Sequence, residues 1–114
     1  MSSITTHVLD TSLGRPAGGV SVNLERANGK GGWEPVALAV TDEDGRVREL
    51  LRNGEPILKG VYRMIFDTST YFSARGVSAF YPSVIIAFDV QDPDEHYHVP
   101  LLLSPYGYST YRGS

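Results

Sequence analysis

Short runs of β-forming residues separated by turn residues are the main pattern along the chain. Turn residues gather at Gly14 to Pro16, Asn28 to Gly32, Asp42 to Gly45, Asn53-Gly54, Asp92 to Asp94 and Ser104-Pro105. Strands that recur at a spacing of about 8–12 residues are typical of an all-β sandwich or barrel. The pattern predicts strands near Ile4 to Asp10, Val20 to Arg26, Trp33 to Thr41, Arg46 to Leu50, Gly60 to Asp67, Ser83 to Val90, Tyr97 to Leu103 and Tyr108 to Arg112.

One segment breaks this pattern and predicts a short helix. From Thr68 to Arg75 the residues do not alternate, Thr68 or Ser69 is the expected N-cap, and Gly76 ends the helix. Helix propensity in the segment is weak, so we expect one or two turns. The sequence therefore predicts two four-stranded sheets and one short helix.

Alternation along two predicted strands assigns histidines to the outer face of a sheet, because residues two apart share a face. In the first strand Ile4 and Val8 are apolar, so His7 points away from the core. The seventh strand carries an apolar stripe made of Tyr97, Val99, Leu101 and Leu103. Its opposite face then carries His96, His98 and Pro100.

The fourth predicted strand adds a positive charge to this outer set. Val47 faces inward, and therefore Arg46 and Arg48 face outward. Two histidines and an arginine thus project from the outer faces of three strands. The sequence leaves open whether those strands are neighbours.

Length and composition limit the class of protein. The 114 residues form a single domain, 1–114, since a chain of this length buries roughly 65% of its unfolded surface and has no surplus for a second core. No apolar stretch reaches the ~18 residues of a membrane span, which predicts a soluble protein without a membrane partner. A net charge of −3 with scattered basic residues argues against nucleic-acid binding.

Cysteine content and the chain ends bear on the compartment. The chain has no cysteine, so neither disulfides nor thiolate metal ligands contribute. The first ten residues lack the basic and apolar regions of a secretory signal, and the last three are not the peroxisomal Ser-Lys-Leu. We therefore expect a cytoplasmic protein.

Each candidate residue also has a plainer interpretation. A single histidine in a small domain is more often a surface or packing residue than a catalyst. His7, His96 and His98 together would alternatively suit a zinc site, because two histidines at i and i+2 on a strand can bind one metal ion. The acidic turns lack the spacing of a calcium loop. Exposed aromatic residues at a strand edge suit an interface, and here they are Tyr106, Tyr108 and Tyr111.

Three blocks of the chain match a known signature. They are THVLDTSLGRPA at Thr6 to Ala17, TDEDGRV at Thr41 to Val47, and HYHVPLLLSPYGYSTYRGS at His96 to Ser114. The third block is the most specific, since a terminal Tyr-Arg-Gly-Ser follows His-x-Pro at a fixed distance. The blocks resemble the transthyretin-like 5-hydroxyisourate hydrolases, whose functional residues fall here on His7, Arg46, His98 and Ser114.

The resemblance implies a transthyretin-like (prealbumin-like) Greek-key β-sandwich of about eight strands in two sheets. It implies a homotetramer, a dimer of dimers built by edge-strand pairing, with active sites in the channel between the dimers. The implied reaction is hydrolysis of 5-hydroxyisourate at a ring amide in urate degradation, part of purine metabolism. Its product is 2-oxo-4-hydroxy-4-carboxy-5-ureidoimidazoline. No metal and no organic cofactor is implied.

The alternative that the resemblance leaves is a non-catalytic small-ligand carrier. Transthyretin is similar to this chain in length and strand pattern. It lacks the histidine, the arginine and the terminal tetrapeptide at the matching places. Their presence here favours the enzyme.

The implied site residues suit the hydrolysis of a ring amide. A neutral imidazole, with an ordinary pKa of about 6.5, can take a proton from water, so His7 or His98 is the expected base. Arg46 offers a planar, permanently charged donor for the carbonyl oxygen or an oxyanion. Ser114 is expected to orient a histidine or the water through its hydroxyl or a terminal carboxylate. Tyr111 is an expected substrate contact.

Overall fold

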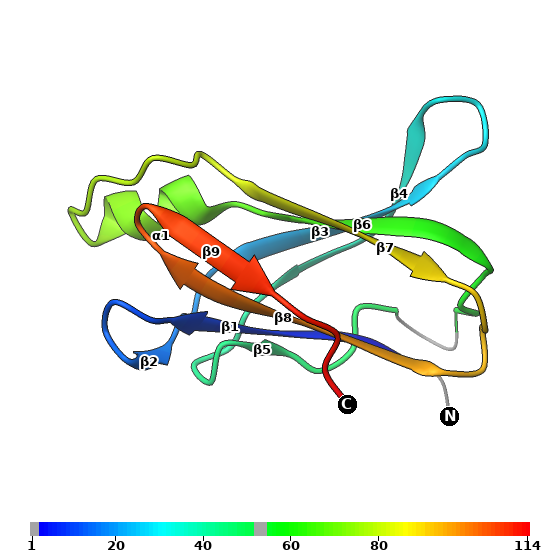
Figure 1. Ribbon diagram of the computed structural model, residues 1–114, viewed down its shortest axis with the longest axis horizontal. Coiled ribbons are helices and arrows are strands. Elements are labelled where there is room, and N and C mark those ends of the chain that lie inside the picture. Colours follow the sequence, from blue (N-terminus) through cyan, green and yellow to red (C-terminus); the bar gives the residue numbers. More distant parts are fainter. Residues whose placement is uncertain (1–2, 52–54) are drawn as a thin grey trace.

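Two β-sheets pack face to face with the apolar core between them, as Figure 1 shows. The computed structural model describes residues 3–51 and 55–114, so the predicted turn at Asn53-Gly54 lies outside the described residues. The first sheet has the order β2-β1-β8-β9, with β5 also paired to β1. The second sheet has the order β4-β3-β6-β7.

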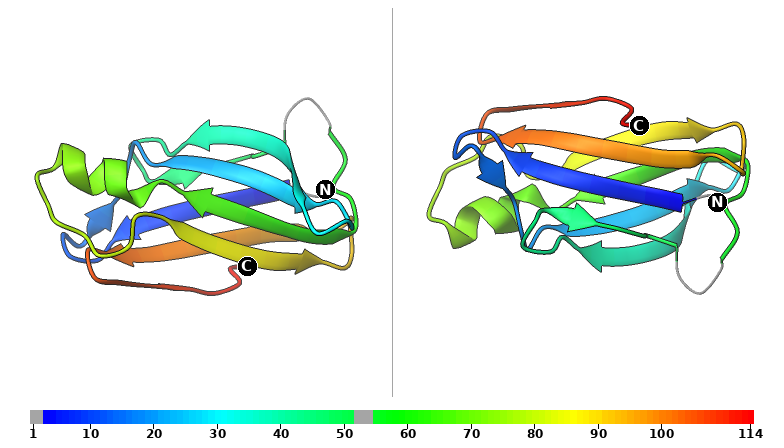
Figure 2. Two further views of the ribbon diagram at one scale, coloured as in Figure 1. Left: turned by 90° about the horizontal axis from the view of Figure 1, so that it is seen from above. Right: turned by 90° about the horizontal axis from the view of Figure 1, so that it is seen from below.

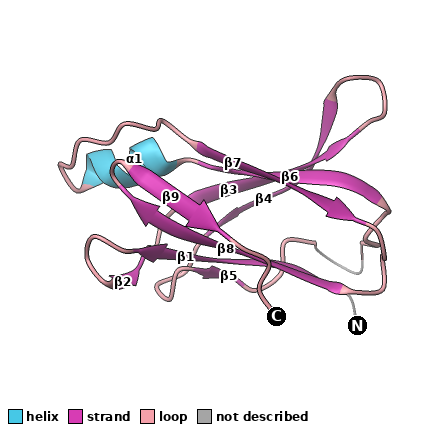
Figure 3. Cartoon of the chain, in the orientation of Figure 1, coloured by secondary structure: helices cyan, strands magenta, loops and turns pink. Residues whose placement is uncertain are grey.

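The elements of the described residues follow the predicted order. The strands are β1 Ser3–Asp10, β2 Arg15–Pro16, β3 Ser21–Ala27, β4 Trp33–Val40, β5 Arg46–Val47, β6 Gly60–Phe66, β7 Val84–Val90, β8 His96–Ser104 and β9 Gly107–Thr110. The single helix in this part of the chain is α1, Thr68–Ala74, which lies at one end of the sandwich (Figure 3). The predicted all-β, two-sheet class with one short helix is confirmed.

The structure differs from the predicted elements at one extra strand and two element ends. Residues 15 and 16 form β2 and make the first sheet five-stranded, whereas they were expected to be turn. Strand β5 ends at Val47 and not at Leu50. Beyond Val47 the N–H of Ile4 in β1 donates to the side-chain carboxylate of Glu49, at 3.1 Å, and not to a backbone carbonyl of that segment. The N-cap of α1 is Asp67, whose carboxylate accepts the N–H of Thr70, and not Thr68 or Ser69.

The C-terminal strand is also shorter than predicted, although its pairing resumes later. Strand β9 ends at Thr110, and an isolated bridge then joins Gly113 to His98 in the same register as the β8–β9 pairs. The interruption lies beside Pro100, which has no N–H to donate to the neighbouring strand. The chain therefore stays beside β8 as far as the bridge at Gly113.

The predicted alternation is confirmed on both strands that carry histidines. In β1 the buried positions are Ile4, Thr6, Val8 and Asp10, and in β8 they include Tyr97, Val99, Leu101 and Leu103. His7 and His98 are half-buried on the other face. Pro100 is on that outer face but is buried, because Gly113 packs against its ring.

A buried carboxylate ties the end of β1 to the helix. Asp10 accepts hydrogen bonds from the N–H and hydroxyl of Ser12, the N–H of Leu13, and the hydroxyl of Tyr71 at 2.7 Å. Burial opposes ionisation of Asp10, but these hydrogen bonds outweigh it and hold its pKa below the ordinary range. Burial, together with the hydrogen bond to this carboxylate, raises the pKa of Tyr71 to about 12.

We expect Tyr71→Phe to lower the free energy of unfolding by about 1–3 kcal/mol, because it leaves a buried carboxylate oxygen without its donor. Urea unfolding followed by circular dichroism measures the change. Tyr106→Phe is the matched control, since Tyr106 is exposed. Equal stability of the two variants would contradict a contribution of the Asp10–Tyr71 contact.

Candidate active site

The three strands that carry the outward histidines and arginine are neighbours. Strand β1 pairs antiparallel with β5 on one side and parallel with β8 on the other, as the right-hand view of Figure 2 shows. His7 is the direct partner of Arg46, and Thr5 is the direct partner of His98. The structure thereby answers the question that the sequence left open.

A polar hollow lies on this outer face. Its volume is about 210 Å³, and it is lined by Thr5, Thr6, Arg46, Val47, Arg48, His96, His98 and Ser114. Three of the expected catalytic residues, Arg46, His98 and Ser114, therefore meet at one place. His7 lies beside the hollow through its pairing with Arg46, and it is not among the lining residues.

The turn before β5 fixes the positions of both Arg46 and His7. The carboxylate of Asp42 accepts the N–H groups of Asp44 at 2.9 Å and Arg46 at 3.0 Å. Gly45 has a φ of +74°, and a Cβ there would collide with the carbonyl of Val8, so glycine is required. The carbonyl of Asp44 lies 2.9 Å from Nε2 of His7. The acidic turn of the sequence is thus a support for the site.

The hydrogen bond of His7 determines where its neutral ring carries a proton. A backbone carbonyl only accepts, so Nε2 must donate to Asp44. In neutral His7 the lone pair is then on Nδ1.

His98 is held from two sides. Its Nδ1 lies 2.7 Å from the hydroxyl of Thr5. On the other side Gly113 packs so closely that a Cβ at this position would collide with Cδ2 of the imidazole. Within residues 3–51 and 55–114, Nε2 of His98 has no hydrogen-bond partner. The reactive nitrogen left available to the hollow is therefore Nε2.

Several positive neighbours act on His98. Burial is the main cause that lowers its pKa, and the nearby His96, Arg46 and His7 lower it further by repelling a positive charge. The ring of His96 is stacked on that of His98, with centroids 6.3 Å apart and planes 10° apart. The lowered pKa favours the neutral form of the His98 ring.

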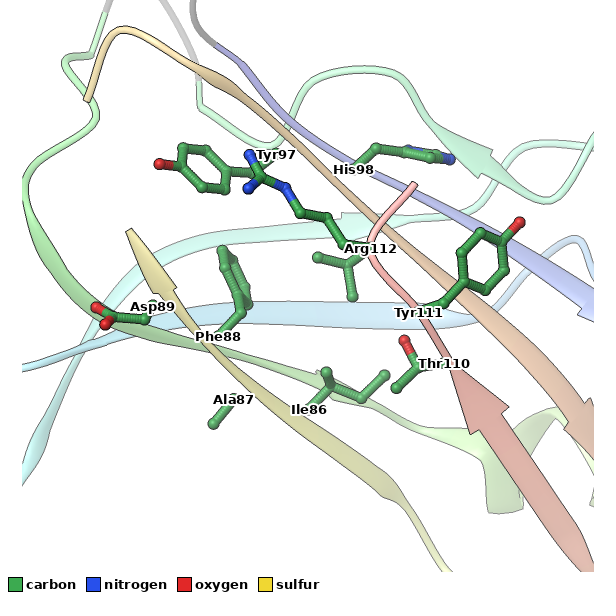
Figure 4. Close-up of a pocket in the computed structure, with 10 residues that line it drawn as sticks. Ile86, Ala87, Phe88, Asp89, Tyr97, His98, Thr110, Tyr111 and Arg112 are labelled. Carbon is green, nitrogen blue, oxygen red and sulfur yellow. The ribbon is translucent and has the colours of Figure 1, made fainter. Parts of the chain in front are cut away.

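A second, larger hollow has a different character. It measures about 300 Å³ and lies between β7 and the C-terminal segment (Figure 4). Apolar side chains of Ile86, Phe88 and Val99 line much of it, and the guanidinium of Arg112 lies over the ring of Tyr97 at 4.8 Å. Tyr111 is part of this hollow and is not brought to the polar one, which only His98 shares with it.

The zinc alternative finds no support in the described part of the chain. No group of three or more histidine, cysteine, aspartate or glutamate side chains there is arranged to hold a metal ion. The histidine nitrogens are directed to other partners: Nδ1 of His96 contacts the hydroxyl of Ser3, and Nε2 of His7 contacts a carbonyl. The donor set therefore suits proton transfer rather than metal binding.

Sequence reasoning missed the role of Thr5 in this site. Alternation places Thr5 on the same outer face as His7, which is a usable signal. Its contact with His98 depends on the parallel pairing of β1 and β8, which no local pattern reveals. Arg48 and His96 were assigned to the outer face, and both line the polar hollow.

The fold and the site define a class, a two-sheet β-sandwich that presents histidines and an arginine on the outer face of one sheet. The model of the HIUase/Transthyretin family matches residues 4–113. The chain belongs to this family. The transthyretin-like fold expected from the sequence is confirmed.

Relatives that match over nearly the whole chain carry hydrolase names. The chain is 44% identical to a 5-hydroxyisourate hydrolase of Pseudomonas aeruginosa, over 100% of this chain and 93% of that protein. It is 48% identical to 5-hydroxyisourate hydrolase 2 of Rhizobium meliloti, over 97% and 95%.

Solved structures of two kinds have the same fold. The 5-hydroxyisourate hydrolase of Klebsiella pneumoniae superposes with a TM-score of 0.85 at 36% identity, over 100% of this chain and 94% of that one. Sea bream transthyretin in complex with thyroxine superposes with a TM-score of 0.90 at 34% identity, over 97% and 94%.

We expect His96→Asn to raise the pKa of His98 toward its ordinary value, because one of the groups that repel its positive charge is removed. Burial remains, so the recovery is partial. NMR titration of the His98 ring protons measures the pKa. His96→Lys keeps a positive charge and is the control, for which no rise is expected. A pKa of His98 that is unchanged or lower in His96→Asn would contradict this electrostatic account.

Proposed function

We propose that this protein hydrolyses 5-hydroxyisourate to 2-oxo-4-hydroxy-4-carboxy-5-ureidoimidazoline, and that His7, Arg46, His98 and Ser114 carry the reaction without a cofactor. The observation that supports this site is the meeting of Arg46, His98 and Ser114 in one polar hollow, with His7 paired to Arg46. The names of the relatives at 42–48% identity support the substrate.

Cytoplasmic residence remains a prediction from the sequence. Within residues 3–51 and 55–114, no helix is long and apolar enough to cross a membrane.

His98 is the base of the proposed mechanism. Its neutral ring has a lowered pKa, and its Nε2 has no partner within the described residues. Nε2 takes a proton from water as the water oxygen bonds to the ring carbonyl carbon. The same proton then passes to the ring nitrogen as the C–N bond breaks, so His98 ends the cycle neutral.

Arg46 and His7 stabilise the developing charge. The guanidinium of Arg46 lines the hollow and donates to the carbonyl oxygen, which becomes an oxyanion when water attacks. Its backbone is fixed by the Asp42 carboxylate, so the donor is in place before substrate binds. His7, with Nε2 bound to the Asp44 carbonyl, offers Nδ1 to the substrate or to its water.

Ser114 and Tyr111 have different parts in the proposal. Ser114 closes the hollow next to His98, where its hydroxyl orients the water. Tyr111 lies on the larger hollow, and its proposed contact with substrate therefore requires a molecule that extends past His98 toward the C-terminal segment. His98 lines both hollows and makes this extension possible.

The proposal includes a homotetramer, a dimer of dimers with the sites in the channel between dimers. Strands β7 and β9 each form one edge of a sheet, and edges of this kind can pair with a second copy. Exposed aromatic residues lie near the starts of these two strands, among them Phe80 and Tyr106, whose exposed fractions are 70% and 69%. Tyr81 and Tyr108 pack edge to face at 5.5 Å and link the two edges. The polar hollow lies on the outer face of the first sheet, where a second dimer would cover it.

A small-ligand carrier is the second candidate, because sea bream transthyretin in complex with thyroxine has the same fold. A hydrolase accelerates the decay of freshly made 5-hydroxyisourate above its spontaneous rate. A carrier binds a ligand without converting it. Ultraviolet absorbance of 5-hydroxyisourate with and without the protein separates the two, and a rate equal to the spontaneous one would exclude the proposed enzyme.

We expect His7→Ala, Arg46→Ala and His98→Ala each to lower kcat/KM by about 10²-fold or more, the usual cost of losing an acid-base or oxyanion group. The absorbance assay measures the rates. Arg15→Ala is the matched control for loss of a positive charge, since Arg15 is exposed on β2 of the same sheet. Folded variants with normal turnover would show that the site is assigned to the wrong residues.

We also expect Gly113→Ala to lower kcat/KM by about 10²-fold, because the added methyl group collides with the His98 ring and displaces it. Gly107→Ala, in the strand that precedes Gly113, is the control. There the nearest atom to a new Cβ is the Ser104 hydroxyl oxygen at 3.8 Å, an ordinary contact. Equal activity of the two glycine variants would mean that the close packing of Gly113 does not position His98.

A further inference from the structure

Thr5 is the one side chain that contacts a nitrogen of His98 in the described part of the chain. Its hydroxyl oxygen lies 2.7 Å from Nδ1, and both residues are half-buried on the outer face. The two are direct partners in the parallel register of β1 and β8. Threonine is branched at Cβ and therefore stiff at χ1, which suits a fixed contact.

A hydroxyl next to an imidazole allows two arrangements. If Thr5 donates to Nδ1, a neutral ring carries its proton on Nε2 and has no lone pair to offer the hollow. If Thr5 accepts from Nδ1–H, the lone pair lies on Nε2 and the ring can act as a base there. The two arrangements give opposite chemistry, although they have the same heavy-atom geometry.

We propose that Thr5 is a positioning residue, whose hydroxyl oxygen accepts the Nδ1 proton of His98 and so keeps the lone pair on Nε2, facing the hollow. This inference rests on the proposed function, in which His98 is the base. Nδ1 keeps its proton throughout the cycle, and only Nε2 gains and loses one. The hydrogen bond from Nδ1–H to the Thr5 oxygen is therefore the same in the neutral and the charged ring. Neither side chain has to rotate between the uptake and the release of the proton at Nε2.

The arrangement also matches the surroundings of His98. The packing of Gly113 against Cδ2 restricts rotation of the ring, so the Thr5 contact is kept and Nδ1 and Nε2 do not exchange places. His7 shows the converse arrangement one step along β1, because its Nε2 donates to the Asp44 carbonyl. The two neighbouring histidines then hold opposite tautomers, with lone pairs on Nδ1 of His7 and on Nε2 of His98.

The test combines kinetics with the ¹⁵N chemical shifts of the His98 ring. Thr5→Val keeps the shape and removes the hydroxyl, whereas Thr5→Ser keeps the hydroxyl and removes the methyl group. We expect kcat to fall about 10-fold in Thr5→Val with KM changed much less, the factor that one hydrogen bond of ordinary strength represents. Thr5→Ser should have a kcat close to that of the wild type, because it keeps the hydroxyl group.

Ser3→Ala is the matched control, because Ser3 makes the same hydroxyl–imidazole contact to His96 two pairs away along the two strands. We expect its kcat to stay within about twofold of the wild type. At a pH where His98 is neutral, the wild-type spectrum should show a protonated Nδ1 and an unprotonated Nε2. In Thr5→Val the two shifts should move toward each other as the tautomers mix.

A wild-type His98 that is protonated on Nε2 overturns the inference, even if Thr5→Val fails to fold. Normal kcat in Thr5→Val, or an equal loss in Thr5→Ser, overturns it as well, since the second result would assign the effect to packing. Failure of the proposed function is distinguishable from failure of the Thr5 inference. In the first case the wild-type protein itself does not accelerate the hydrolysis of 5-hydroxyisourate. The chemical shifts decide the Thr5–His98 contact independently of activity.

Discussion

The site depends on the pairing of β1 with two different neighbours. Antiparallel pairing with β5 sets His7 opposite Arg46, and parallel pairing with β8 sets Thr5 opposite His98. Side chains along a strand alternate between faces, so a slip of one residue in β1 would turn His7 toward the core and Val8 outward. The fully buried Ile4 and Val8 prevent this slip. Core packing thereby fixes the functional face of the sheet.

Backbone groups and short polar side chains hold the reactive groups in place. The Asp42 carboxylate holds the turn that carries Arg46, the Asp44 carbonyl holds His7, and the Gly113 backbone packs against His98. These supports are part of strands or of a tight turn, which gives a site more precise geometry than flexible loops do. Glycine at 45 and 113 is required by space, since in each case a Cβ would collide with a neighbour.

Electrostatics and burial work in the same direction at His98. Burial disfavours the charged ring, and electrostatic repulsion from His96, Arg46 and His7 lowers its pKa further. A cluster of cationic groups around a base has a cost in repulsion. The repulsion favours the neutral ring that the proposed role of His98 requires, and the same cationic groups would stabilise the oxyanion of the proposed reaction.

The all-β class, the sequence of elements along the chain apart from β2, and the outward direction of His7, Arg46 and His98 were predictable from the sequence. They follow from local chemistry, because turn residues and a two-residue alternation act over a few positions. The short end of β5 and the Asp67 cap were not predicted, since each depends on one side chain competing with the backbone for a hydrogen bond. The resemblance of the three blocks supplied the candidate residues, and none of these blocks includes Thr5.

Only the tertiary structure decided that the outward residues share a site. The partners of β1 come from distant parts of the chain, and a parallel pair such as β1 and β8 requires a long connection whose course no local pattern specifies. That pairing brings Thr5 to His98, and the turn before β5 brings the Asp44 carbonyl to His7. The sequence by itself determined which residues face outward. Long-range strand pairing determined which of them meet, because hydrogen-bond register between strands depends on the packing of the whole core.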